Sequence, residues 1–112
     1  MNQGAKTIIS PVSDLAKAKE FYTALLGVAP YADAPYYVGY RVGDQEIGLG
    51  PRGHRGTGAL PYYLVDDIKQ TLDQLLNAGG QGLEDIEDVG GGKLIASVKD
   101  PDGNAIGLMQ NP

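Results

Sequence analysis

Few side chains in this sequence could carry out chemistry by themselves. The 112 residues include one histidine and no cysteine, which excludes a disulfide, a thiolate metal site and a cysteine nucleophile. The histidine, His54, lies in a glycine-rich stretch beside Arg52 and Arg55. A solvated loop histidine is a simpler interpretation there than a base or a metal ligand. The sequence contains no nucleophile elbow, phosphate-binding loop or dinucleotide-binding fingerprint.

The acidic residues are explained by structure rather than by catalysis. Asp66 and Asp67 resemble a catalytic pair, but they directly precede a predicted helix, whose free N–H groups a carboxylate caps. A second acidic group is predicted to be a solvated loop: Glu84, Asp85, Glu87 and Asp88. We therefore assign no residue a catalytic role.

Tyrosine is the side chain most able to bind a ligand here. The chain has seven tyrosines, one phenylalanine and no tryptophan. Tyrosine rings that line a pocket can stack on a flat ligand while their hydroxyls orient it, although strand tyrosines can equally fill a sheet interface. Arg41 and Lys99 could supply cations for an anionic ligand, or could be solvated charges at strand edges.

The first half of the chain predicts one helix and its strands. Residues 7–12 predict a strand, and Ser13 predicts the N-cap of a helix that runs to about Leu26 and ends at Gly27. The apolar face of that helix contains Leu15, Ala18, Tyr22, Leu25 and Leu26. Residues 28–35 predict a short, poorly formed strand, and two clearer strands follow at residues 36–42 and 45–49.

The second half repeats this pattern. Residues 60–65 predict a strand, Asp66 caps a helix that ends at Gly79, and residues 93–99 and 105–109 predict further strands, after a longer loop at 82–88. Its helical face contains Ile68, Thr71, Leu72, Leu75 and Leu76. The tripeptide Ile-Gly-Leu ends each half, at residues 47–49 and 106–108. The sequence thus predicts one domain, residues 1–112, of two modules, about 5–51 and 59–110, joined by a glycine-rich linker.

The repeat predicts an α+β fold of two βαβββ modules whose sheets curl around a cleft. Alternate strand residues share a face, so the isoleucine and leucine of each tripeptide pack on a helix and its glycine faces the cleft. Tyr63 and Tyr40 should lie on the helix side. The residues predicted to line a ligand-binding cleft are Thr7, Ile9, Tyr37, Arg41, Glu46, Gly48, Leu60, Tyr62, Gly107 and Met109.

These features resemble the vicinal oxygen chelate superfamily of glyoxalases, extradiol dioxygenases, and fosfomycin- and bleomycin-resistance proteins. The resemblance is carried by residues 11–15 (PVSDL) before a helix that contains Phe21-Tyr22 and ends with residues 25–27 (LLG). Residues 65–68 (VDDI) repeat the first signal, and residues 100–104 (DPDGN) precede the last strand. The fold hosts many activities, so the resemblance implies the fold more than the function.

In the metal-dependent members, the resemblance implies histidine and glutamate ligands at four positions. These positions are occupied here by Thr7, Gly48, Leu60 and Gly107, none of which has a carboxylate or an imidazole. A tight divalent site needs about three or four such ligands, and Glu46 alone does not supply them. We therefore predict no metal and no cofactor.

Composition excludes several partners. The net charge of -5 argues against nucleic acid and anionic membranes, and no apolar run is long enough to span a bilayer. The sequence favours a cytoplasmic homodimer that binds a small organic molecule without metal, in the manner of a bleomycin-resistance protein. One alternative is a lyase, isomerase or dioxygenase with a non-standard metal site that includes Glu46. Another is a regulatory or structural module without a ligand.

Overall fold

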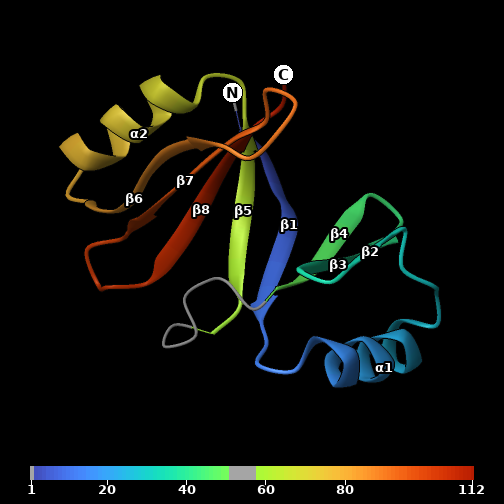
Figure 1. The fold of residues 1–112 in the computed structure, drawn as a ribbon. Coiled ribbons are helices and arrows are strands. Elements are labelled where there is room, and N and C mark those ends of the chain that lie inside the picture. Colours follow the sequence, from blue (N-terminus) through green and yellow to red (C-terminus); the bar gives the residue numbers. More distant parts are fainter. Residues whose placement is uncertain (1, 51–57) are drawn as a thin grey trace. The chain divides into compact units, whose positions relative to one another are not determined.

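The helices and strands follow one another in the order that the repeat predicts. The computed structural model describes residues 2–50 and 58–112. The first half contains β1 (Asn2–Pro11), α1 (Leu15–Leu26), β2 (Ala32–Ala34), β3 (Tyr37–Val42) and β4 (Gln45–Gly50). The second contains β5 (Leu60–Val65), α2 (Ile68–Asn77), β6 (Gln81–Asp88), β7 (Leu94–Lys99) and β8 (Ala105–Gln110) (Figure 1).

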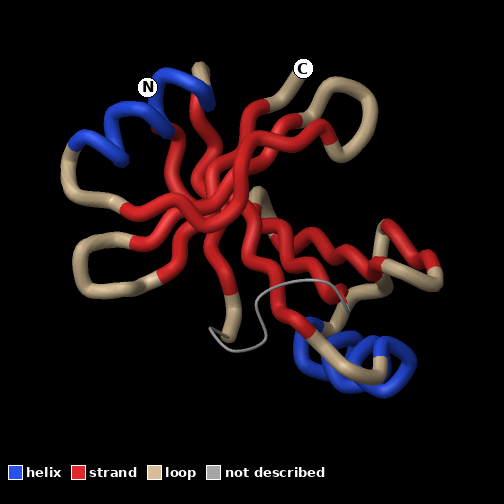
Figure 2. Tube along the Cα trace, turned by 60° about the vertical axis from the view of Figure 1, so that its left-hand side comes forward, coloured by secondary structure: helices blue, strands red, loops and turns tan. Residues whose placement is uncertain are grey.

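The chain divides into two compact units. The N-terminal unit is Lys6–Leu60, and the C-terminal unit combines Met1–Ala5 with Pro61–Pro112. In the first unit the strand order is β2-β3-β4-β1, and in the second it is β5-β8-β7-β6. Within each unit, the first and last strands in sequence form a parallel pair, β1–β4 and β5–β8. The other pairs within each unit are antiparallel. Each unit combines four strands with one helix (Figure 2), which confirms the predicted α+β class and the βαβββ modules. The cleft stays a prediction.

In the N-terminal unit, α1 covers one face of the sheet. Val38, Tyr40 and Leu49 are buried there, and Leu15, Ala18, Tyr22, Leu26 and Ile47 pack against them. The Tyr40 hydroxyl donates to the Lys19 carbonyl at 2.9 Å, so burial leaves it satisfied. The helix-side positions of Tyr40 and Ile47 are thus confirmed. The prediction for Leu25 is wrong, because its side chain is 65% exposed.

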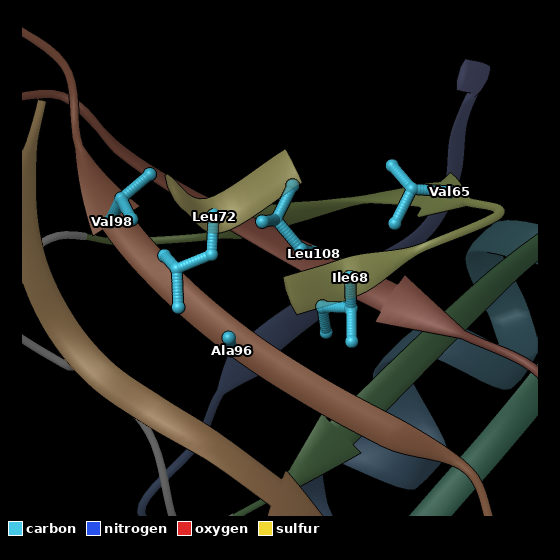
Figure 3. Close-up of a cluster of buried hydrophobic side chains, with 6 residues drawn as sticks. All are labelled: Val65, Ile68, Leu72, Ala96, Val98 and Leu108. Carbon is cyan, nitrogen blue, oxygen red and sulfur yellow. The ribbon is translucent and has the colours of Figure 1, made fainter. Parts of the chain in front are cut away.

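In the C-terminal unit, α2 covers the equivalent face. Its buried cluster contains Val65, Ile68, Leu72, Ala96, Val98 and Leu108 (Figure 3). Tyr63, Leu75 and Ile106 pack against that cluster, as the alternation predicts. Leu76 does not: its side chain is 41% exposed, so the predicted apolar face of this helix was one residue too wide.

In both helices, the N-cap is one residue later in the sequence than predicted. The N-cap of α1 is Asp14 rather than Ser13, and its carboxylate accepts from the Lys17 N–H at 3.1 Å. The N-cap of α2 is Asp67 rather than Asp66, with the same bond from the Gln70 N–H at 3.1 Å. A capping side chain must reach the N–H three residues onward, and in each unit only this aspartate is placed to do so.

The ends of the helices differ. Gly27 ends α1 with a left-handed backbone at φ 71°, as predicted. Helix α2 instead ends at Asn77 and is capped by Ala78, before the predicted stop at Gly79.

The largest error of secondary structure concerns residues 82–88. The predicted acidic loop is most of strand β6, which pairs with β7 through two register shifts. Because of these irregularities, a partly buried residue occurs at every third position rather than at every second one. The sequence therefore lacks the alternation by which a strand is predicted.

His54, Arg52 and Arg55 lie outside the described residues. No helix in the described part of the chain is long and apolar enough to cross a membrane.

Candidate functional site

Each sheet has a second face, turned away from its own helix, which we call the distal face of that unit. On the N-terminal unit, strand register places Thr7, Glu46 and Arg41 side by side, since Glu46 pairs with both neighbours. One pair of residues further along β4, Gly48 lies between Ile9 and Gly39 in the same way. Paired residues project to the same side of a sheet. The distal face therefore contains the predicted cleft residues of this unit.

Tyrosine rings lie over the glycines of the N-terminal distal face. A Cβ atom added at Gly48 would meet the Tyr37 hydroxyl and would lie 2.6 Å from Ile9 Cδ1. A Cβ added at Gly39 would lie 2.9 Å from the Tyr37 ring and 3.0 Å from that of Tyr31. All three distances are shorter than an ordinary van der Waals contact. The two glycines are thus required by the rings packed on them.

The charged groups of this face have partners within it. Glu46 Oε2 accepts hydrogen bonds from the Tyr31 hydroxyl and, at 3.2 Å, from the Tyr37 hydroxyl. The Arg41 guanidinium carbon lies 4.0 Å from the centroid of the Tyr31 ring, a cation–π contact. Burial raises the pKa of the Tyr37 hydroxyl above its usual value, and the nearby Arg41 charge opposes that rise.

The C-terminal distal face is organised around one row of residues. Gly107 pairs with Tyr62 on one side and with Ser97 on the other, and Ser97 in turn pairs with Glu84. The Tyr62 ring lies over the glycine: an added Cβ would be 2.5 Å from Cδ2 and 2.7 Å from Cγ. Ile95 pairs with Met109 and Glu87 in the next row, and Met109 is 6% exposed.

The polar groups of this row differ from those of the N-terminal unit. Ser97 is 1% exposed, and its hydroxyl has no hydrogen-bond partner in the part of the chain that the structure describes. Burial, followed by the charges of Glu84 and Glu87, raises the pKa of the Tyr62 hydroxyl. Tyr62 therefore keeps its proton in a locally negative environment.

The family model of the glyoxalase/bleomycin resistance protein/dioxygenase superfamily matches residues 5–108. The chain belongs to this superfamily. It is 35% identical over 119 aligned positions to a protein of Vibrio parahaemolyticus named "Probable lactoylglutathione lyase", covering 89% of this chain and 85% of the relative. A Mycobacterium tuberculosis relative named as a glyoxylase is 29% identical over 110 positions, which cover 88% of this chain. The chain spans only 42% of that relative's length.

Solved structures of the superfamily share the fold. A Vibrio splendidus member gives a TM-score of 0.70 at 15% identity, with 99% of this chain and 100% of the other covered. The fold is therefore shared over 99% of this chain. The family match over residues 5–108 includes Thr7, Gly48, Leu60 and Gly107, the four positions at which the resemblance implies metal ligands.

The residues of this superfamily member do not fit a divalent metal centre at those positions. Gly48 and Gly107 lie under tyrosine rings, so a glutamate at either position would need the space that a ring fills. Thr7 and Leu60 are buried and have no imidazole. Within residues 2–50 and 58–112, no group of three or more histidine, cysteine, aspartate or glutamate side chains could hold a metal ion.

The residues predicted to line one cleft fall into two sets, one in each unit. In the N-terminal unit, Ile9, Tyr37 and Gly48 make one contact group, and Arg41 pairs with Glu46 beside them. In the C-terminal unit, Tyr62 packs on Gly107, and Met109 follows on the same face. Leu60 is buried at the start of β5. Whether these residues bind a ligand stays a prediction.

Sequence reasoning missed four participants. Tyr31 precedes β2 in a segment predicted to be a short, poorly formed strand, which gave no reason to assign its side chain to a face. Gly39 lies inside a strand, and its role was not recognised. Glu84 was missed because residues 82–88 were interpreted as a loop. Ser97 lies in the predicted strand 93–99, but no residue type or spacing marked it out. A signal for Gly39 was present, since a strand glycine often marks close approach by another group.

Proposed function

We propose that this superfamily member binds a small organic molecule without a metal centre, so as to sequester or sense it. The observation that supports this proposal is the pair of tyrosine rings on the two glycines. Where metal-dependent relatives would present a carboxylate, this chain has Tyr37 over Gly48 and Tyr62 over Gly107. At both positions, an aromatic ring therefore occupies the space of a metal-binding carboxylate.

Such a surface suits a partly apolar, planar ligand. Tyrosine offers a large contact area with little conformational entropy to lose, and its hydroxyl gives orientation. Tyr37 and Tyr62 are both partly exposed, and burial raises the pKa of both hydroxyls, so both stay protonated at neutral pH. The Tyr37 hydroxyl already donates to Glu46, which leaves the Tyr62 hydroxyl as the donor for a ligand. A ligand carrying hydrogen-bond acceptors or a flat ring would use both properties.

Native mass spectrometry tests the proposal directly. The full chain would be purified without chelator or metal-affinity resin, and measured before and after incubation with Mn²⁺, Ni²⁺ or Zn²⁺. We expect no stoichiometric divalent ion and no chelator-dependent change in Tm. We also expect the mass of a homodimer, and an organic adduct would begin to identify the ligand. One divalent ion per chain would contradict the proposal.

A second candidate is a lyase or isomerase. It is favoured by the 35% identical relative, whose name includes lactoylglutathione lyase. Glu46 is the first suspect for an unusual site, because it lies on the distal face beside two tyrosine hydroxyls. Activity that a chelator removes and a divalent ion restores would support this candidate. A protein equally active or inert with chelator would count against it.

A further inference from the structure

The polar groups of the two distal faces are satisfied to different degrees. In the N-terminal unit, Glu46 accepts two hydroxyl hydrogen bonds, and the Arg41 guanidinium stacks on Tyr31. In the C-terminal unit, the Ser97 hydroxyl is buried and unpartnered among the described residues. A buried hydroxyl without a hydrogen-bond partner destabilises the folded state. The presence of Ser97 at this position therefore indicates a role other than stabilising the fold.

The position of Ser97 indicates what that role is. Ser97 pairs with Gly107 and with Glu84, so its side chain projects to the distal face between the two. Gly107 has no side chain of its own, and the Tyr62 ring lies over it. One row therefore combines an unpartnered hydroxyl oxygen, a carboxylate and an aromatic ring.

The charge of this row is negative. Glu84 lies in the row, and Glu87 lies in the next row beside Ile95. Lys99 is on the same face, two residues after Ser97. The charges that reach the Tyr62 hydroxyl are nevertheless those of the two glutamates, as the raised pKa of that group indicates. A cation would therefore be attracted to this row, and an anion repelled.

We infer that the row formed by Tyr62, Gly107, Ser97 and Glu84 is a binding subsite for an organic ammonium group. The ammonium N–H groups donate to the Ser97 hydroxyl oxygen and the Glu84 carboxylate, and the Tyr62 ring contacts the cation or its apolar substituent. Entry of the ligand requires the Tyr62 ring to turn off Gly107, on which it packs. This inference rests on the proposed small-molecule function and names the chemical class of ligand.

The test uses three probes of similar size and different charge. The ¹⁵N-labelled full chain would be titrated at neutral pH with benzylamine, which is then an ammonium, with benzyl alcohol and with benzoate. We expect benzylammonium to shift the amide resonances of Ser97, Gly107 and Glu84, and to bind more tightly than either other probe. Ser97→Ala should weaken that binding about 2- to 10-fold, because it removes one hydrogen-bond acceptor. Glu84→Gln should weaken it by a similar factor of about 2- to 10-fold, because it keeps an acceptor oxygen but removes the negative charge that strengthens the bond.

Matched controls come from the helix α1 region of the same chain. Ser13→Ala and Glu20→Gln change exposed residues of the same types and should leave the affinity unchanged. A thermal melt without ligand adds an independent readout. Ser97→Ala should raise Tm by about 3–6 °C, because it removes a buried hydroxyl that has no partner among the described residues. The same variant should therefore be more stable and bind benzylammonium more weakly.

Three results would overturn the inference. They are equal binding of benzyl alcohol and benzylammonium, unchanged affinity in Ser97→Ala, or a lower Tm for that variant. A stoichiometric divalent ion in the native mass spectrum would overturn the proposed function instead. The two failures are thus distinguishable.

Discussion

In each unit a tyrosine ring packs over a strand glycine, but the tyrosine comes from a different strand relative to that glycine. In the N-terminal unit the ring over Gly48 comes from Tyr37, an antiparallel neighbour two residues out of register, and its hydroxyl end makes the contact. In the C-terminal unit the ring over Gly107 comes from Tyr62, which pairs directly with Gly107 on the parallel strand. Its contact includes Cγ, the ring atom that is bonded to Cβ. The repeat conserves the pairing of ring and glycine but not its geometry.

This difference extends to the polar groups. The Tyr37 hydroxyl ends at Glu46, so carboxylate and hydroxyl satisfy each other. The Tyr62 ring lies in a row with the Ser97 hydroxyl, which has no hydrogen-bond partner among residues 2–50 and 58–112. The charges of Glu84 and Glu87 act on the Tyr62 hydroxyl. On the N-terminal distal face, the Glu46 carboxylate and the tyrosine hydroxyls bond to one another. On the C-terminal distal face, the buried Ser97 hydroxyl has no hydrogen-bond partner among the described residues.

The largest expected effect separates the two glycines. Gly107→Ala should lower the free energy of unfolding by about 1–3 kcal/mol, because the new methyl group meets Cγ and Cδ2 of Tyr62, which cannot move without the whole ring. Gly48→Ala should cost less, since it meets the far ends of Tyr37 and Ile9, which can shift. Urea unfolding followed by circular dichroism measures both.

A second substitution checks that the ring is the cause. Tyr62→Leu combined with Gly107→Ala should recover at least ~0.5 kcal/mol relative to the sum of the single changes, as expected for residues in contact. Equal costs for the two glycine variants, or strict additivity of this pair, would contradict the comparison.

A smaller effect, equal in the two units, is expected from the helix caps. Asp14→Ala and Asp67→Ala each remove one carboxylate-to-N–H bond of the same 3.1 Å length, so each should cost about 1 kcal/mol. Ser13→Ala is the matched control and should cost almost nothing, because Ser13 is not the cap. A larger loss from Ser13→Ala than from Asp14→Ala would reverse the assignment.

The smallest expected effect concerns pH. Tyr62 has a pKa raised above the ordinary 10.0, so above pH 10 the unfolded chain loses this proton more readily than the folded chain does. The stability associated with the protonated hydroxyl is fully present below pH 10 and is lost as pH rises through the folded pKa. Tyr62→Phe should therefore reduce the loss of stability between pH 9 and pH 11, measured by urea unfolding.

Charge variants distinguish the causes in the two units. Glu84→Gln should lower the pKa of Tyr62, whereas Arg41→Ala should raise the pKa of Tyr37, because the neighbouring charges have opposite signs. Titration of the assigned tyrosine ring resonances by NMR measures both. Shifts of the same sign in the two variants would contradict this account.

The sequence predicted the elements that follow simple periodicity. Alternation assigned Tyr40, Tyr63 and the apolar residues of both tripeptides to the helix side, and the structure confirms those positions. It also assigned Tyr37, Arg41 and Glu46 to one face, which strand register confirms. Such predictions succeed because each depends only on neighbouring residues in one regular strand.

The errors arose where local pattern does not determine structure. The repeat predicted a second strand in this half, but residues 82–88 were assigned to a loop, because the bulges of β6 break alternation. That error concealed Glu84 as a neighbour of Ser97. The interpretation of Gly48 and Gly107 was incomplete for a different reason. The sequence showed which side chains were absent there, but only packing across strands shows that a ring fills each space.

The irregular strand β6 also affects how the protein behaves at high concentration. It lies at one end of the C-terminal sheet, and its bulges and acidic side chains make a poor template for a further strand from another molecule. Strand β2, at the end of the N-terminal sheet, is only three residues long and offers little backbone to extend. These two edge strands therefore oppose aggregation by strand addition, β6 through its charge and irregularity and β2 through its short length.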